Sequence, residues 1–76
     1  MYINHYFHLE DAPAITAPAV EGLSYEVGDT VFIDRFNVDT NRYPQGVWLK
    51  LIRRKYVGHN VKRANVHWDA VVTPKP

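Results

Sequence analysis

The sequence predicts a small, mainly β domain, most simply a barrel of four or five strands. Hydrophobic residues make up 46% of the chain and aromatic residues 13%, which is typical of a chain that folds around a core. Apolar and polar residues alternate in several short segments, and turn-forming residues separate these segments. The length of 76 residues allows a single domain over 1–76 with a thin core.

The N-terminal part of the chain is expected to contain one strand and one irregular segment. Ile3, Phe7 and Leu9 are spaced for one side of a strand, which predicts a short strand over 1–9. Residues 10–24 contain two prolines, and proline restricts itself and the residue before it to extended conformations. We therefore expect an extended loop or arm at 10–24.

A second strand is expected over 30–36. Gly28 and Asp29 form a turn signal directly before a run of β-branched and aromatic residues. The segment 27–33 resembles the opening strand of many Src-homology-3-like small barrels. This resemblance implies a barrel architecture and identifies no functional residues.

The segment 44–57 fits both a helix and a strand. Its first residues overlap an expected loop over 37–46, whose last four residues have the proline and glycine positions of a type I turn. As a helix it would be capped by Gly58 and would gather Trp48, Leu51, Ile52 and Tyr56 on one face. As a strand it would pair with 61–72, whose apolar residues alternate and need a partner. We favour the strand, and an α+β fold with a helix at 44–57 is the alternative.

A hairpin in which Val57 pairs with Val61 determines which side chains of these two strands face the core. The inward residues would be Trp48, Ile52, Tyr56, Ala64, Val66, Trp68 and Ala70. The opposite face would carry Arg53, Lys55, Arg63 and His67. Lys50 and Arg54 would also point inward, so they must reach water at a rim, or a bulge must shift the alternation. Residues 73–76 are expected to form a frayed tail.

The charges are segregated along the chain, although the net charge is only +1. Residues 1–41 contain seven acids and one base, and residues 42–76 contain eight bases and one acid. The two halves therefore carry −6 and +7. Such segregation allows either mutual attraction within the fold or an electropositive binding face.

The basic residues of the C-terminal half are the candidate binding site. The candidates are Arg42, Arg53, Arg54, Lys55, Lys62 and Arg63. Phosphate backbones attract such clusters, and Trp48 and Tyr56 could stack on unpaired bases unless they belong to the core. The leading hypothesis is a non-enzymatic binding module whose basic hairpin face docks onto an acidic macromolecule, with nucleic acid slightly favoured. The alternative is a small accessory or inhibitor protein, of the viral or mobile-element type, that binds one protein partner.

Catalytic and metal sites have little support in the sequence. The chain has no cysteine, no glycine-rich phosphate loop and no nucleophile elbow. His5 and His8 are three residues apart, which places them on opposite sides of a strand. We expect no enzymatic activity, no metal site and no cofactor.

Location and assembly are weakly constrained. The absence of cysteine fits a reducing compartment, so we expect a cytoplasmic protein. No apolar run approaches the roughly 20 residues that span a bilayer, so we expect no membrane association. An exposed edge strand would allow a homo-oligomer.

Overall fold

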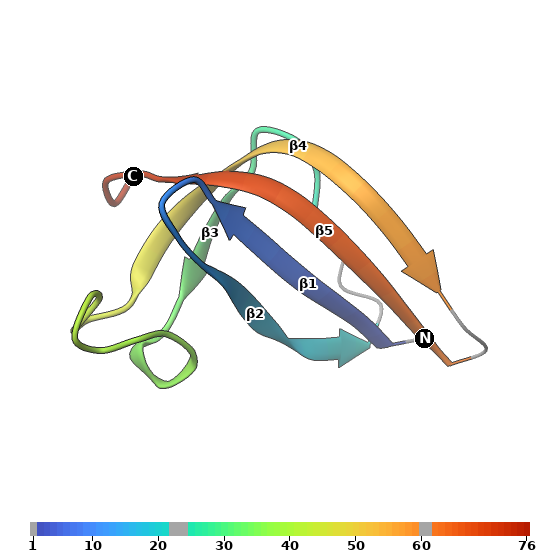
Figure 1. Ribbon diagram of the computed structural model, residues 1–76, viewed down its shortest axis with the longest axis horizontal. Helices are drawn as coiled ribbons and strands as arrows, with labels where there is room; N and C mark the ends of the chain where they lie inside the picture. The colour runs from blue at the N-terminus through green and yellow to red at the C-terminus, as the bar shows by residue number, and fades with distance from the viewer. Residues whose placement is uncertain (1, 22–24, 60–61) are drawn as a thin grey trace.

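The computed structural model describes residues 2–21, 25–59 and 62–76. They form one five-stranded sheet that curls into a half-barrel, with the strand order β2-β1-β5-β4-β3 (Figure 1). The elements in chain order are β1 (Tyr2–Leu9), β2 (Ala12–Glu21), β3 (Thr30–Ile33), the 3-10 turn η1 (Arg35–Asn37), β4 (Val47–His59) and β5 (Arg63–Val72). The prediction of a mainly β small barrel is confirmed. The alternative helix at 44–57 is wrong, because β4 runs through this segment and its pairing with β5 satisfies the backbone groups of both strands.

The expected arm at 10–24 requires a correction, because residues 12–21 form strand β2 and pair antiparallel with β1. Phe7 lies opposite Ile15, and both side chains are buried. The extended conformation follows from the prolines, and β2 tolerates them because it is an edge strand with a neighbour on one side only. Residues 22–24 of this segment lie outside the described residues.

Strand β3 begins as expected and ends earlier than expected. Gly28 adopts a φ of 94° in the turn that precedes it. The expected strand over 30–36 stops at Ile33, because the Asp34 carboxylate accepts a hydrogen bond from the Phe36 amide at 2.9 Å and starts η1. The loop after η1 closes in the expected tight turn, in which the Gly46 amide donates to the Tyr43 carbonyl at 3.2 Å.

The hairpin of β4 and β5 has a different register from the expected one, and this changes the inward face of β4. Val57 pairs with Val66 rather than with Val61, a residue outside the described ones, and Leu51 pairs with Ala70. The inward residues of β4 are consequently Val47, Leu49 and Leu51. On β5 the expected inward residues Ala64, Trp68 and Ala70 are buried, and Val66 packs against the core.

Two of the expected core residues of β4 lie on the other face. Ile52 is 48% exposed, and Trp48 is half-buried against Phe32 with a ring-centroid distance of 5.1 Å. The side chain of Tyr56 lies outside the described residues. Lys50 is exposed on the side of the sheet opposite the core, whereas Arg54 lies at the rim beside Trp68, as the expected register required. Irregularities in pairing between Leu51 and Arg53, and between Arg54 and Tyr56, shift the alternation further along β4.

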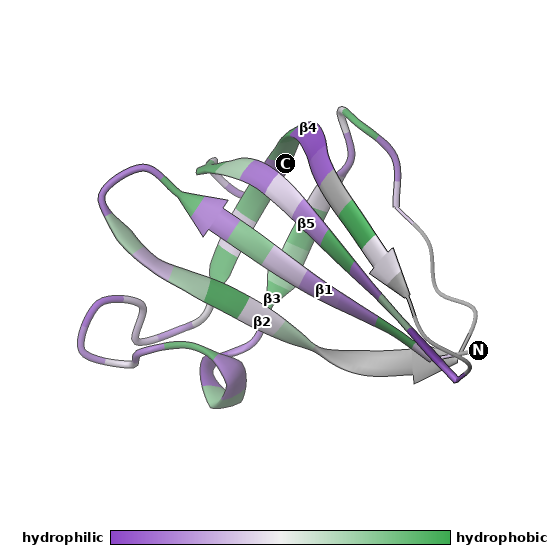
Figure 2. Cartoon of the chain, turned by 45° about the vertical axis from the view of Figure 1, so that its right-hand side comes forward, coloured by the Kyte–Doolittle hydropathy of each residue, from purple (hydrophilic) through white to green (hydrophobic). Residues whose placement is uncertain are grey.

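The core fills the concave side of the sheet. Its largest fully buried side chains are Trp68, Phe7, Leu49, Leu51 and His5. Figure 2 shows the resulting alternation of hydrophobic and hydrophilic residues along β1, β5 and β4. The indole N–H of Trp68 donates to Nδ1 of His5 at 3.0 Å, so this ring nitrogen carries no proton. The buried imidazole of His5 thus accepts the hydrogen bond that the buried indole N–H of Trp68 needs.

The C-terminal residues leave the sheet after β5. The Thr73 amide still donates to the Trp48 carbonyl at 2.9 Å, and residues 74–76 are exposed. In the part of the chain that the structure describes, no helix has the length and apolar character needed to cross a bilayer.

Candidate binding face

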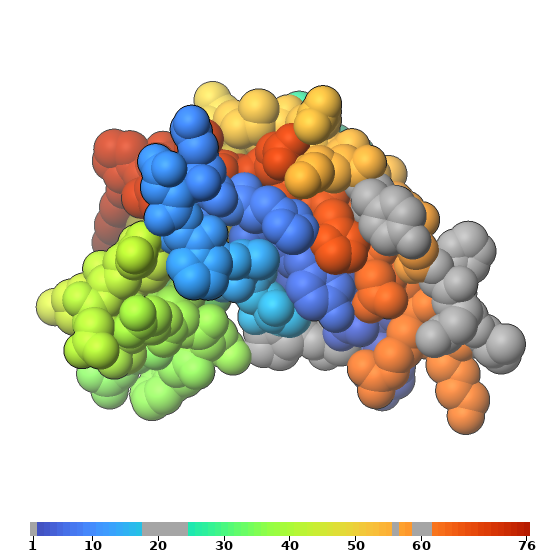
Figure 3. All heavy atoms as spheres, viewed as in Figure 1, coloured from blue at the N-terminus to red at the C-terminus, as the bar shows by residue number. Residues whose placement is uncertain are grey.

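The side of the sheet opposite the core carries most of the polar residues of β1, β4 and β5. Because side chains alternate along a strand, the residues between the buried positions point away from the core. We call the surface formed by these residues the outer face. It consists of Asn4, Tyr6, His8, Arg53, Lys55, Arg63, Asn65, His67 and Asp69. Figure 3 shows β1, β5 and β4 side by side in one face of the molecule.

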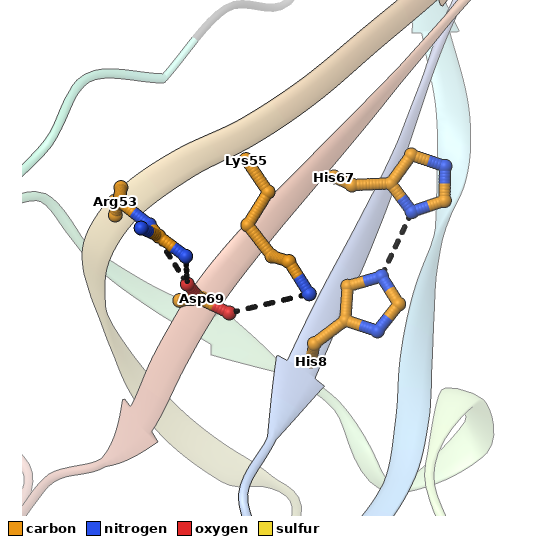
Figure 4. A network of polar contacts seen from close by, with 5 residues as sticks. All are labelled: His8, Arg53, Lys55, His67 and Asp69. Atoms are coloured by element: carbon orange, nitrogen blue, oxygen red, sulfur yellow. Dashed lines mark hydrogen bonds and ion pairs between the residues drawn. The ribbon is translucent and has the colours of Figure 1, made fainter.

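Two of the candidate bases meet at one carboxylate of the outer face (Figure 4). Nη2 of Arg53 lies 2.8 Å and Nε 3.0 Å from Oδ2 of Asp69. Nζ of Lys55 lies 3.7 Å from Oδ1 of the same residue. The Arg53 side chain is 69% exposed, so these ion pairs contribute less than about 1 kcal/mol to stability. Two cations therefore share one carboxylate in a solvent-accessible position, and the local charge is positive.

Three aromatic rings from β1 and β5 lie beside this charge cluster. The rings of Tyr6 and His67 stack with centroids 4.7 Å apart and an angle of 12°. His67 also faces His8, with centroids 5.1 Å apart and an angle of 22°. All three side chains are half-buried, so each keeps part of its surface in contact with solvent.

The two histidines of this stack are joined by a hydrogen bond. Nε2 of His8 lies 2.8 Å from Nδ1 of His67, and one of these nitrogens donates its proton to the other. Burial, together with the neighbouring His8 and Lys55, lowers the pKa of His67. The surroundings of His67 therefore favour its neutral form, and Arg53 and Lys55 supply positive charge beside it.

The other candidate bases lie elsewhere. The Arg54 guanidinium is 5.2 Å from the ring centroid of the core residue Trp68, at the rim of the concave side. Lys62 and Arg63 lie at the start of β5, where the Arg63 guanidinium is 5.9 Å from the Tyr2 ring. Arg63 belongs to the outer face, four residues along β5 from His67. The bases expected to gather on one hairpin face are thus divided between its two sides.

Arg42 lies at the opposite end of the molecule from the start of β5. Its Nη1 is 3.5 Å from the Asp11 carbonyl oxygen. It also lines an open hollow of about 420 Å³ between β2 and the segment 36–43. In Figure 3 this segment forms a separate lobe beside β2. Arg42 therefore takes no part in the outer face.

Three carboxylates of the acidic half accept hydrogen bonds within turns. Asp29 accepts from the Glu26 amide at 2.8 Å, and Asp34 accepts from the Phe36 amide. Asp39 accepts from the Asn41 amide at 2.9 Å. Between residues that the structure describes, the ion pairs join Arg53 and Lys55 to Asp69, an acid of the basic half itself.

His5 and His8 lie on opposite faces of β1, as their spacing in the sequence predicted. His5 is buried on the concave side, and His8 lies on the outer face. Among the described residues, no group of three or more histidine, cysteine, aspartate or glutamate side chains is placed to hold a metal ion.

Sequence reasoning placed His67 on the same hairpin face as Arg53, Lys55 and Arg63, and it did not identify Tyr6, His8 and Asp69 as neighbours of these bases. The sequence feature that could have identified the residues of 1–9 is the polar and aromatic character of every second residue, which marks one side of a strand as solvent-facing. The missing information was the parallel pairing of β1 with β5, which places Tyr6 opposite His67 and His8 opposite Asp69. Compared with known proteins, the chain matches no family model, and no curated protein or solved structure is significantly similar to it.

Proposed function

We propose that this protein is a non-enzymatic binding module that docks its outer face onto an acidic macromolecule, and that single-stranded nucleic acid is the target its chemistry fits best. The observation that carries the proposal is the position of Arg53 and Lys55, which share one carboxylate beside the stacked rings of Tyr6 and His67. Proteins that bind single strands combine cationic groups for the phosphates with aromatic rings for the bases.

The charge of the outer face supports a polyanionic partner. A phosphate that replaces water around Arg53 or Lys55 meets an exposed cation whose bond to Asp69 is weak. Asp29 and Asp34 of the N-terminal half are engaged in their own turns, whereas Glu10 lines a hollow together with Lys55 and Asp69. Each phosphate contact on a single strand contributes about 0.7 to the slope of log affinity against log salt concentration.

The rings support unpaired bases rather than a duplex. Tyr6 and His67 form a stacked pair on the outer face, and a base can continue such a stack. Stacking of this kind contributes about 1–3 kcal/mol per base. The amide side chains of Asn4 and Asn65, joined at 3.0 Å in the next row, provide donors and acceptors for base edges.

Fluorescence anisotropy with a mixed-sequence single-stranded oligonucleotide tests the proposal. The double variant Arg53→Gln/Lys55→Gln should reduce the salt slope by about 1.4, because two phosphate contacts are lost. Tyr6→Leu should weaken binding at every salt concentration with an unchanged slope. Lys75→Gln, in the exposed C-terminal tail, is the matched control and should behave as the wild type. No binding at 50 mM salt by the folded wild-type protein would refute the proposal.

The carboxylate of Asp69 offers a test in the opposite direction. Asp69→Asn removes the only anionic partner that the structure shows for Arg53 among the described residues. We expect tighter binding of the oligonucleotide by several-fold and a loss of stability below about 1 kcal/mol. Unchanged or weaker binding by this variant would argue against the outer face as the binding surface.

A protein partner is the second candidate, and a different part of the molecule favours it. Phe36 is 81% exposed on η1, and the Arg35 guanidinium lies 4.9 Å from its ring centroid. Aromatic and arginine side chains are the usual anchors of protein interfaces. A pull-down from a nuclease-treated lysate distinguishes the two functions: a protein that is retained by the wild type and lost with Phe36→Ala supports this candidate.

A further inference from the structure

His5 lies at the junction between two parts of the sheet. β1 and β2 form an antiparallel hairpin, β3, β4 and β5 pair antiparallel in chain order, and the parallel pairing of β1 with β5 joins the two parts (Figure 1). His5 belongs to β1 and Trp68 to β5, and the indole nitrogen of Trp68 donates to Nδ1 of His5 at 3.0 Å. Only 2% of His5 and 1% of Trp68 is exposed. A buried hydrogen bond therefore connects the two parts.

This hydrogen bond has one possible direction. An indole nitrogen can only donate, so Nδ1 of His5 must accept and carries no proton. If Nδ1 took up a proton, two donors would face each other, and the indole N–H would lose its acceptor inside the core. The hydrogen bond and the protonated imidazole thus exclude each other, and protonation of His5 requires Trp68 to move away.

The described side chains that pack around this pair supply a positive charge and a neutral phenol. The Arg54 guanidinium of β4 is 5.2 Å from the ring centroid of Trp68, and Arg54 and His5 line the same small hollow of about 90 Å³. The Tyr25 ring meets the His5 ring edge-on with centroids 4.6 Å apart, and its phenol is uncharged at neutral and acidic pH. On β2, the residue opposite His5 is Ala17, which carries no charge. The charge of Arg54 therefore opposes a second positive charge at His5.

We propose that His5 makes the stability of this fold acid-sensitive, because its imidazole takes up a proton only when the hydrogen bond with Trp68 breaks and the concave side opens. In the unfolded chain this imidazole is exposed to water and is protonated below the ordinary histidine pKa of about 6.5. At this position the unfolded state then binds one proton more than the folded state, so acid favours unfolding. Each pH unit below about 6 raises the unfolding equilibrium constant by about tenfold. This property does not depend on the proposed nucleic-acid function.

Urea denaturation of the full chain at a series of pH values from about 7 to about 5 tests the proposal. In His5→Asn the amide oxygen can accept from Trp68 near the position of Nδ1, and the side chain does not titrate. From about pH 6 to about pH 5, the unfolding equilibrium constant of the wild type should rise about tenfold more than that of His5→Asn. Phe7→Leu changes a buried neighbour that does not titrate, so this control should lower stability and keep the wild-type pH dependence. A wild-type pH dependence in His5→Asn would overturn the proposal.

Nuclear magnetic resonance of the wild-type protein decides the question if His5→Asn does not fold. The imidazole nitrogen shifts of His5 should remain those of a neutral ring for as long as signals of the folded protein are present. The indole N–H signal of Trp68 in the folded protein should disappear together with these signals as the pH falls. A His5 ring that becomes protonated in the folded protein, with the Trp68 indole signal unchanged, would overturn the proposal.

Discussion

The turn between β3 and β4 provides a sharp test of the backbone geometry. Gly46 adopts a φ of 87°, and a Cβ atom added there would lie 2.6 Å from the Ile33 carbonyl oxygen and 2.7 Å from Cζ of Phe32. Gly28 adopts a similar φ of 94°, but an added Cβ atom would meet no atom within 4 Å. The substitutions Gly46→Ala and Gly28→Ala therefore share the conformational strain and differ in the steric clash.

The expected losses of stability follow from these two contributions. A positive φ at an alanine costs about 1–2 kcal/mol, and this applies to both variants. Overpacking against a backbone atom adds about 1–3 kcal/mol, and this applies to Gly46→Ala alone, because the Ile33 carbonyl belongs to a paired strand. The reduced entropy of the unfolded chain offsets about 0.4–1 kcal/mol in both. We expect Gly46→Ala to be less stable than Gly28→Ala by about 1–3 kcal/mol, a large part of the roughly 4–11 kcal/mol available to 76 residues.

Urea denaturation followed by tryptophan fluorescence and circular dichroism measures both losses. The m-value should be the same for both variants, because the surface exposed on unfolding does not change. The further change Phe32→Ala should restore only part of the stability of Gly46→Ala, since the contact with the Ile33 carbonyl oxygen remains. Equal losses in the two glycine variants, or a larger loss for Gly28→Ala, would show that the turn is not packed as described.

Two further predictions concern the faces of β4 and the ionisation of one tyrosine. Leu51→Ala should destabilise the protein by about 2–5 kcal/mol, because Leu51 is buried, and Ile52→Ala should destabilise it by less than about 1 kcal/mol. Urea denaturation measures both losses. A larger loss for Ile52→Ala would show that Ile52, rather than Leu51, faces the core, as the register expected from the sequence had it. Burial, with a smaller effect of Asp29, raises the pKa of Tyr25, so the folded state holds this proton more tightly than the unfolded state. The free energy of unfolding should therefore fall as the pH rises above about 10, and Tyr25→Phe should show a smaller fall in urea titrations between pH 8 and 11.

The alternation of apolar and polar residues predicted part of the candidate site. The alternation in 61–72 correctly placed Ala64, Trp68 and Ala70 in the core, and by the same alternation Asp69 lies on the outer side. The same reasoning placed Arg54 inward and Arg53 outward, and the structure has them on these two sides of the sheet. The outward position of Lys50 was not predictable in this way, because it depends on the bulges in β4, and a bulge shifts the alternation without a distinctive residue pattern.

The sequence by itself determined a mainly β fold, the turns at 28–29 and 43–46 and the basic character of the C-terminal half. These properties follow from neighbouring residues, because alternation, proline, glycine and side-chain caps act over a few positions. Only the tertiary structure decided that 12–21 completes the sheet and that β1 lies parallel to β5. These pairings join residues far apart in the chain, and it is such pairings that bring His8 and Asp69 into one surface.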